Sequence, residues 1–438
     1  MPRRSELVEM IKPKSRSRLP LVVAAVVVVV MAASLTVVLR PQPMTLPDGE
    51  HKIYNIASAA MVGDQEIPVI IWQSKKQPLT ERIRGAFIAS VDAASSDTKD
   101  LWLINGAAAT LTLDGIMDMA QRDEVARIEP DYKVRLHEQA KSGNLIQSVT
   151  TELDNRYIGR WGVEDIGAPK VWNHGVDGAG VVVAVIDTGV DANHYELKGK
   201  VVGWRDFVNG RPQPYDDLGH GTHVAGVIAG RRFGVAPEAQ LLVAKVFDQY
   251  GEGSTSGIIQ AFQWAIANGA DVINFSGGAT EYTDLWDYTL SEISKRNVIP
   301  VIAAGNFGPA PRTICTPGNV RGTITVGAVD RGKVIAPFSS RGPSSIGGGR
   351  YIKPDVCAPG VDVRSCWPGG GYRTLSGTSQ AAAHVTGATA LLLQEHRGMS
   401  MTAIKSVLEG TSTDLGAPGA DNKYGAGMID AYGAFAAS

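Results

Sequence analysis

The chain has 438 residues, which is enough for a catalytic domain with an accessory domain beside it. Its 42 Lys and Arg residues nearly cancel its 44 Asp and Glu residues, so the formal charge of -2 gives no reason to expect a nucleic acid or another polyanion as partner. Fifty glycines without a G-X-Y period exclude collagen, and three cysteines without a Cys-x-x-Cys pair argue against a disulfide scaffold or a thiolate zinc site.

The N-terminal segment has the features of a membrane anchor. Residues 1–18 form a basic tail, and residues 19–39 then run without a charge, long enough to cross a bilayer core of ~30 Å as a helix. The basic flank predicts a cytoplasmic N-terminus and an extracytoplasmic location for the remainder of the chain. A cleaved signal peptide is the alternative, because Ala32-Ala33-Ser34 offers small residues to a signal peptidase, but the apolar run is longer than is typical of such peptides. We therefore expect a single-pass protein of the cell membrane, with a proline-containing linker over residues 40–53.

Residues 54–137 predict a small α+β domain without any cluster of catalytic residue types. The order of elements, β-α-β-β-α-β, is that of the ferredoxin-like arrangement, and a polar linker over residues 138–155 follows it. The expected elements are a strand at 68–72, a helix at 79–90, two strands at 101–104 and 107–113 around an Asn105-Gly106 hairpin turn, a helix capped by Asp114 and running to about 121, and a strand at 125–134.

Residues 156–438 predict an α/β domain. Apolar β-branched runs alternate with helical stretches, which indicates a mostly parallel sheet with helices on both faces. In such sheets the reactive groups gather at the carboxyl ends of the strands. The expected strands are 181–186, 241–246, 271–275, 298–303 and 323–326, and the expected helices are 221–230, 254–268, 287–295 and 379–397.

Four polar residues stand at such strand ends or helix starts. Asp187 ends a fully apolar strand, where a carboxylate is costly unless it holds a polar partner. His220 lies where a glycine-rich turn enters a helix, and Asn306 follows a strand end. Ser379 lies at a helix start, where free N–H groups and the helix dipole favour a developing oxyanion.

Each of these residues also has an ordinary structural explanation. Ser379 could cap its helix, Asn306 could serve in a turn, and Asp187 could satisfy backbone donors. His220 and His223 could bind a metal, although no third ligand follows at a useful spacing. Taken together, the chain order acid, base and nucleophile is one of the known orders of the Asp-His-Ser triad.

The segments around these residues resemble subtilisin-like serine proteases. The three signature blocks are Asp187-Thr188-Gly189, His220 to Gly226, and Gly377-Thr378-Ser379, and the resemblance covers about residues 161–436. The upstream domain, which ends in the block Val125 to Asp131, resembles the inhibitory propeptide of the same family. Supporting matches are residues 271–276, 303–306, 338–342 and 353–360.

The resemblance implies a chemistry that the residue types also support. Ser379 would attack the scissile carbonyl, His220 would transfer the proton, and Asp187 would orient the imidazole. The side-chain amide of Asn306 and the backbone N–H of Ser379 would hold the oxyanion. The substrate would be an unfolded or extended protein segment, bound by Ser276, Gly277 and Gly278 as an added strand, with Ala303, Ala304 and Gly305 along the other wall of the primary pocket.

The chain departs from the family pattern at several positions. Gln380 follows the nucleophile where a Met is usual, and Ala383 replaces a later Pro. Only Gly230 to Phe233 stands where many relatives carry a calcium-binding loop, and Glu196 replaces a common Asp ligand. We expect that calcium site to be absent, and we expect no catalytic cofactor or metal.

The cysteines allow two further predictions. The resemblance places Cys315 at the floor of the primary pocket, although an ordinary buried apolar role is the simpler interpretation. Cys357 and Cys366 could form a disulfide outside the cytoplasm, but their spacing does not establish the geometry.

Two other classes of protein share part of this pattern. Asp-Thr-Gly also marks aspartic proteases, which need two copies on an all-β body, whereas this chain has one copy. A membrane-tethered binding module on an inactive protease fold is the other alternative, against which the retention of all four site residues argues. We expect a zymogen whose cut between about His137 and Thr151 removes the propeptide as intramolecular inhibitor.

Overall fold

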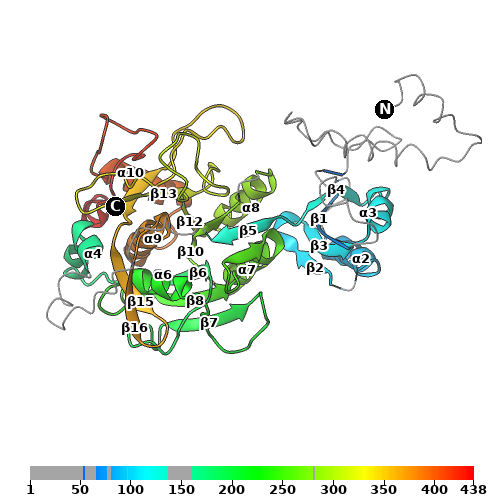
Figure 1. Cartoon of the computed structure of the whole chain (residues 1–438), viewed down its shortest axis with the longest axis horizontal. Helices are drawn as coiled ribbons and strands as arrows, with labels where there is room; N and C mark the ends of the chain where they lie inside the picture. The colour runs from blue at the N-terminus through cyan, green and yellow to red at the C-terminus, as the bar shows by residue number, and fades with distance from the viewer. Residues whose placement is uncertain (1–52, 55–65, 76–79, 96, 137–159, 280–281) are drawn as a thin grey trace, which may run out of the picture. The chain divides into compact units, whose positions relative to one another are not determined.

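The computed structural model describes residues 53–54, 66–75, 80–95, 97–136, 160–279 and 282–438 (Figure 1). The chain divides into two units, residues 1–43 and 44–438, and the first unit lies outside the described residues. The predicted anchor at 19–39 and the predicted linker at 138–155 therefore lie outside them as well. Among the residues that are described, no helix has the length and apolar character needed to span a bilayer.

A seven-stranded parallel sheet forms the centre of the larger part of the chain. The strand order is β14-β13-β12-β10-β6-β8-β7, and each neighbouring pair is parallel. The α/β architecture with a parallel sheet is therefore confirmed. The strands are β6 (Val182–Asp187), β7 (Val201–Asp206), β8 (Gln240–Lys245), β10 (Val272–Phe275), β12 (Ile299–Ala303), β13 (Ile324–Val329) and β14 (Val356–Pro359).

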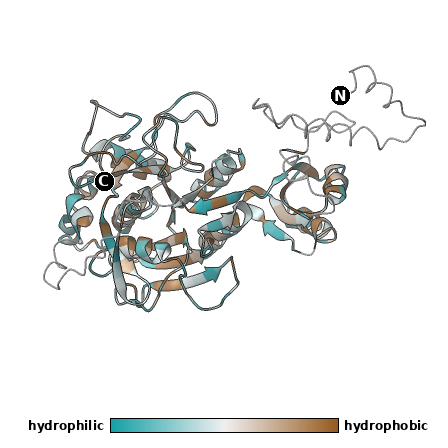
Figure 2. Cartoon of the chain, viewed as in Figure 1, coloured by the Kyte–Doolittle hydropathy of each residue, from teal (hydrophilic) through white to brown (hydrophobic). Residues whose placement is uncertain are grey.

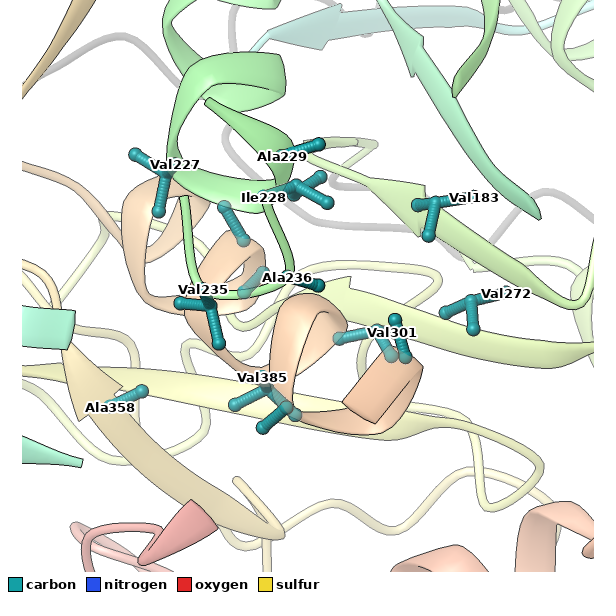
Figure 3. Close-up of a cluster of buried hydrophobic side chains, with 14 of the residues drawn as sticks. Val183, Val227, Ile228, Ala229, Val235, Ala236, Val272, Val301, Ala358 and Val385 are labelled. Atoms are coloured by element: carbon teal, nitrogen blue, oxygen red, sulfur yellow. The ribbon is translucent and has the colours of Figure 1, made fainter. Parts of the chain in front are cut away.

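Alternate residues of the strands enter two separate cores, one on each face of the sheet. On β6, Val183 and Val185 pack into one core, whereas Ala184 and Ile186 pack into the other. The first core contains α6 (His220–Ala229) and α9 (Thr378–Glu395), and the second contains α7 (Thr255–Ala267) and α8 (Leu285–Ser294). Figure 3 shows the first core, in which side chains of α6 and α9 meet valines of three neighbouring strands. Because helices cover both faces of the sheet, we expect reactive polar residues at the carboxyl ends of the strands.

The two outermost strands were missed by the sequence prediction. The edge strand β7 is half-exposed along most of its length, so its sequence lacks the continuous apolar run of a central strand. The other edge strand, β14, ends in a proline, which weakens a strand signal. The remaining elements of this part are α4 (Trp161–Asp165), α5 (Ala168–Trp172), β15 (Val363–Trp367), β16 (Gly371–Leu375), α10 (Met401–Thr411) and α11 (Ala431–Ala437).

Residues 67–130 form a second, four-stranded antiparallel sheet in the order β2-β3-β1-β4, with its own hydrophobic core (Figure 2). The predicted β-α-β-β-α-β order is confirmed in these residues. The elements are β1 (Ile67–Gln73), α2 (Glu81–Asp92), β2 (Lys99–Leu101), the 3₁₀ turn η3 (Trp102–Ile104), β3 (Gly106–Leu111), α3 (Leu113–Ala120) and β4 (Val125–Pro130).

Two local predictions in this small sheet were wrong. Residues 102–104 form η3 and not a strand, because Leu103 and Ile104 turn into the core beneath α7 and α8. The second helix is capped by Thr112, whose side chain accepts from the Gly115 N–H, and not by Asp114.

The predicted strand 125–134 is divided in two. β4 ends at Pro130, and β5 (Lys133–Leu136) pairs with different partners. In a three-stranded antiparallel sheet, β5 lies between β11 (Gly277–Gly278) and β9 (Glu252–Ser254). The segment that follows the small sheet is therefore joined by backbone hydrogen bonds to β9 and β11 of the larger domain.

Candidate active site

Asp187 and His220 meet at the carboxyl end of β6. Asp187 is the last residue of that strand and is fully buried, and its Oδ1 accepts a hydrogen bond from the Thr188 N–H at 2.8 Å. His220 is the first residue of α6, and its Nδ1 lies 2.8 Å from the same oxygen. The sequence prediction that Asp187 holds a polar group fixed matches this contact.

Two glycines make the close approach of these segments possible. Gly189 has φ +120°, and a Cβ there would lie 2.0 Å from the carbonyl oxygen of Tyr215. A Cβ on Gly221 would lie 2.2 Å from the carbonyl oxygen of Gly189. The turn after Asp187 and the first turn of α6 therefore pack backbone to backbone, at a distance that only glycine permits.

The surroundings of His220 favour its protonated form. Burial is the largest single influence and opposes protonation, but the charge and hydrogen bond of Asp187, with the charge of Asp216, together raise the pKa of His220 above its ordinary value. An imidazole held in this way is oriented and ready to accept a proton on its second nitrogen.

Ser379 is the second residue of α9 and is buried. Its hydroxyl makes no hydrogen bond in the structure, so it neither caps the helix nor is bonded to His220. The helix is preceded by Gly377, which provides no side-chain cap. The structure thus joins Asp187 to His220 by a hydrogen bond and leaves the Ser379 hydroxyl free to take a partner.

Asn306 follows β12 and faces the start of α9. Its Oδ1 accepts hydrogen bonds from the backbone N–H and the hydroxyl of Thr378, each at 3.0 Å. This fixes which end of the amide faces the helix start. A Cβ placed on Gly377 would lie 2.8 Å from Gln380 Oε1, 3.3 Å from Asn306 Nδ2 and 3.8 Å from the Ser379 nitrogen, so the two nitrogens lie near each other beside Gly377, with the Gln380 side-chain oxygen next to them. Two such donors are suited to holding a negatively charged oxygen.

The residues expected to bind substrate lie at or directly after the carboxyl ends of β10 and β12, two neighbouring strands of the sheet. Gly277 and Gly278 pair with Leu136 and Arg135 of β5, and Ser276 directly precedes them. Ala303 ends β12, and the Gly305 N–H donates to Thr378 Oγ1 at 3.1 Å. Their roles in substrate binding stay predictions.

Cys315 lies beside the same wall. A Cβ on Gly305 would lie 2.5 Å from the Cys315 sulfur, and the Cys315 N–H donates to the Ala304 carbonyl at 3.0 Å. Burial raises the pKa of the Cys315 thiol to about 12, so it is a neutral group there.

The second histidine of α6 does not join His220 in a metal site. His223 is buried, and its Nε2 lies 3.1 Å from the carbonyl oxygens of Val363 and Arg373. Burial, followed by the nearby charge of His220, lowers the pKa of His223 to about 3. Within the described ranges no three His, Cys, Asp or Glu side chains are grouped as metal ligands.

The surroundings of Glu196 do not fit a calcium ligand. Its carboxylate is fully buried and accepts from the Arg232 N–H at 2.7 Å, from Arg232 Nε at 2.6 Å and from the Tyr372 hydroxyl at 3.0 Å. A cation would have to displace these donors, and the Arg232 guanidinium already supplies positive charge.

Cys357 and Cys366 do not form a disulfide. All three cysteines are free thiols and are buried. Burial raises the pKa of the Cys366 thiol to about 12 and also raises that of Cys357. These thiols therefore behave as small apolar groups in the core.

Three residues of the site were not singled out from the sequence. Thr188 accepts from the Gly221 N–H at 2.9 Å through its hydroxyl, and Thr378 orients Asn306. Lys245 is fully buried, and its ammonium donates to the Thr188 carbonyl, to Asp217 and to the Phe247 carbonyl at 2.6–2.7 Å. A lysine that ends an apolar strand was the available signal, because such a charge needs partners.

The fold and the family comparison define the class of protein. Residues 178–427 match the family model described as the subtilase family. The chain belongs to this family, and it is a serine endopeptidase, a hydrolase of peptide bonds.

Individual relatives agree with this assignment. The chain is 34% identical to an alkaline protease of Shouchella clausii, over 80% of this chain and 95% of the relative. It is 38% identical to subtilisin E of Bacillus subtilis, over 77% of this chain and 82% of the relative. Among solved structures it is similar to fervidolysin of Fervidobacterium pennivorans, a keratinolytic enzyme related to subtilisin, with a TM-score of 0.69, 26% identity, and coverage of 85% of this chain and 61% of that chain.

Proposed function

We propose that Asp187, His220 and Ser379 form the catalytic triad of this endopeptidase. His220 would accept the Ser379 hydroxyl proton on Nε2 while Ser379 Oγ forms a bond to the scissile carbonyl carbon. The resulting imidazolium would then donate the proton to the leaving amine, which gives an acyl-enzyme that water hydrolyses. The observation that carries this proposal is the 2.8 Å contact between His220 Nδ1 and the buried Asp187 carboxylate.

Asn306 would stabilise the tetrahedral intermediate. Because Thr378 occupies the Asn306 carbonyl oxygen, the amide N–H₂ end is left on the side where the Ser379 N–H also lies. Two preorganised donors at one point favour the charge that develops on the carbonyl oxygen.

A fluorophosphonate probe tests the triad. We expect the processed protein to be labelled on Ser379, and His220→Ala to abolish this labelling without unfolding the protein. The absence of labelling in correctly folded, processed protein would favour the alternative of a binding module on an inactive protease fold.

The proposal extends to a zymogen in which residues 54–137 are the inhibitory propeptide. β5 occupies the position between Gly277–Gly278 and Glu252–Ser254 where an extended substrate would add as a strand. Leu136, the last residue of β5, and Leu218 both lie beside Gly251. Leu218 precedes His220 by two residues. The strand therefore leads toward the proposed triad.

Side-chain contacts support the same docking. Asp131 accepts from the Ser256 N–H at 2.8 Å and from its hydroxyl at 2.6 Å, at the start of α7. Gln263 donates to the Asp100 carbonyl and accepts from the Leu103 N–H, both at 3.0 Å. These contacts would help the protease domain to fold and would hold the propeptide in place afterwards.

Activation would require a cut in the segment after Leu136. The ladder between β5 and β11 ends at the pairing of Leu136 with Gly277, so we favour the first bonds of the window 137–151. The membrane anchor at 19–39 and the extracytoplasmic location also belong to this proposal, and they are supported by the charge and hydropathy of the sequence alone. Cleavage after the propeptide would release the protease domain from the membrane.

N-terminal sequencing of the mature protein tests this life history. The wild-type chain is expected to begin within positions 137–151 after maturation, whereas Ser379→Ala should accumulate at full length in a host that lacks related proteases. Normal processing of Ser379→Ala in such a host would refute self-cleavage.

A further inference from the structure

The carboxylate of Asp216 organises the segments on both sides of the Asp187–His220 contact. It lies four residues before His220 in the loop that leads into α6. Its two oxygens accept five hydrogen bonds: from Thr188 Oγ1 at 2.8 Å, Leu218 N at 3.2 Å, Gly219 N at 2.7 Å, Thr222 N at 2.8 Å and Thr222 Oγ1 at 2.7 Å.

These donors belong to the immediate neighbours of the two proposed triad residues. Thr188 directly follows Asp187, and Gly219 directly precedes His220. The Thr188 hydroxyl also accepts from the Gly221 N–H at 2.9 Å. One carboxylate thus connects the strand end that carries the acid with the helix start that carries the base.

The same carboxylate takes the place of a helix cap. The N-cap residue of α6 is Gly219, which has no side chain to offer, and the first N–H groups of a helix have no acceptor within the helix. Asp216 accepts from Thr222 N in the first turn, and its negative charge is favourable at a helix N-terminus. The orientation of His220, as the first residue of this helix, depends on that turn.

We infer that Asp216 is a positioning residue of this protease, which fixes the backbone around Asp187 and His220 in the geometry their contact needs. This inference rests on the proposed function of the triad. Asp216 touches no substrate and no reacting atom in this scheme, so it acts through the two residues it aligns.

The charge of Asp216 provides a readout that a purely structural role would not give. Three ionisable groups influence His220 or lie beside it: Asp187 on β6, Asp216 in the preceding loop and His223 one turn later on α6. The Lys245 ammonium on β8 donates to the Thr188 carbonyl, next to Asp187. Burial has the largest single influence and lowers the pKa of His220, whereas Asp187 and then Asp216 raise it. Removing the Asp216 charge should therefore lower that pKa, and the loss of activity on acidification should move to lower pH.

Asp206 offers a matched control. Its carboxylate also organises a loop, because it accepts from the N–H groups of Val208, Asn209 and Arg211 and from the Tyr215 hydroxyl at 2.9–3.0 Å. It makes none of the contacts to Thr188 or to α6 that Asp216 makes.

The experiment compares Asp216→Asn with Asp206→Asn after each full-length chain has matured, with rates normalised to active sites titrated by a fluorophosphonate. For Asp216→Asn we expect kcat to fall about tenfold to a hundredfold with KM within about twofold of wild type. We also expect the acid limb of kcat/KM to move to lower pH, because the Asp216 charge is one of the influences that raise the pKa of His220. Asp206→Asn should lower thermal stability and leave both kinetic quantities near the wild-type values.

Variants of Thr188 test the same contacts. They are measured if Asp216→Asn does not mature. Thr188→Val removes the hydroxyl that donates to Asp216, whereas Thr188→Ser keeps a hydroxyl. We therefore expect a lower kcat for Thr188→Val than for Thr188→Ser. Unchanged kcat and acid limb in Asp216→Asn, equal losses in Asp206→Asn, or equal activity of the two Thr188 variants would overturn the inference. Fluorophosphonate labelling of the processed wild-type protein separates the two proposals: if Ser379 is labelled while Asp216→Asn has a normal kcat and acid limb, only the role of Asp216 is lost.

Discussion

Replacing Arg232 with alanine would leave the buried Glu196 carboxylate without its cationic partner. Removing one partner of a fully buried ion pair costs about 3–5 kcal/mol. Here the Arg232 side chain is 57% exposed, and Glu196 would keep the Tyr372 hydroxyl and one backbone N–H. We therefore expect a loss of about 2 kcal/mol in the free energy of unfolding, which corresponds to a fall in Tm of about 4–8 °C.

The assay is thermal unfolding of mature, fluorophosphonate-inactivated protein at a fixed scan rate, with and without EGTA. Arg231→Ala is the matched control. Arg231 is the exposed neighbour of Arg232, and its guanidinium donates to the Lys198 carbonyl and not to the Glu196 carboxylate. This variant should lower Tm by less than about 2 °C.

The chelator distinguishes a guanidinium from a calcium ion at this position. If Arg232 supplies the positive charge, EGTA shifts the Tm of the wild-type protein and of Glu196→Gln by the same amount, whatever other ions the protein binds. A chelator effect that is present in the wild-type protein and disappears in Glu196→Gln would show that Glu196 ligates a metal, and the reasoning would fail.

Three further predictions concern the proposed site and the propeptide. Because the base must be neutral, kcat/KM should fall as the pH drops through the pKa of His220, which lies above its ordinary value of about 6.5. Asp187→Asn should lower that pKa and should also lower kcat by about 10⁴-fold, and a pH–rate profile measures both effects. An acid limb that is unchanged in Asp187→Asn would argue against the contact between Asp187 and His220. Asn306→Ala should lower kcat by about 10²–10³-fold with a small change in KM, the range known for one such donor in subtilisin, and a loss confined to KM would assign it to substrate binding instead. Asp131→Ala removes the two hydrogen bonds from Ser256 to the Asp131 carboxylate. It should raise the inhibition constant of the propeptide at least about tenfold in a progress-curve assay. An unchanged inhibition constant would mean that the contact between Asp131 and Ser256 contributes nothing to docking.

The central strands and the positions of the site residues could be predicted from the sequence because buried parallel strands are continuous apolar runs. Asp187 and Asn306 each interrupt or follow such a run, so their unusual chemistry is visible without coordinates. The edge strand β7 could not be predicted in this way, since half-exposed residues carry no such run.

Contacts between distant segments were beyond the reach of sequence patterns. The division at Pro130, after which β5 leaves the small sheet, depends on backbone partners more than 100 residues further along the chain. The bonds that Arg232 and Tyr372 make to Glu196 could not be predicted, because Arg232 lies in the loop after α6 whereas Tyr372 lies on β16, 140 residues further along the chain. Asp216 was not singled out, since a loop aspartate before a helix is common and its five donors are known only from the fold.

The most direct measurement is a crystal structure of the matured protein at a pH where it is active. The Ser379 hydroxyl has no hydrogen-bond partner in the present structure, so this measurement decides whether Ser379 and His220 are bonded in the active enzyme. We predict that His220 Nε2 lies within about 3.2 Å of Ser379 Oγ while Nδ1 stays bonded to Asp187. An imidazole turned away from both side chains in the active crystal form would contradict the assignment of these three residues as the catalytic group.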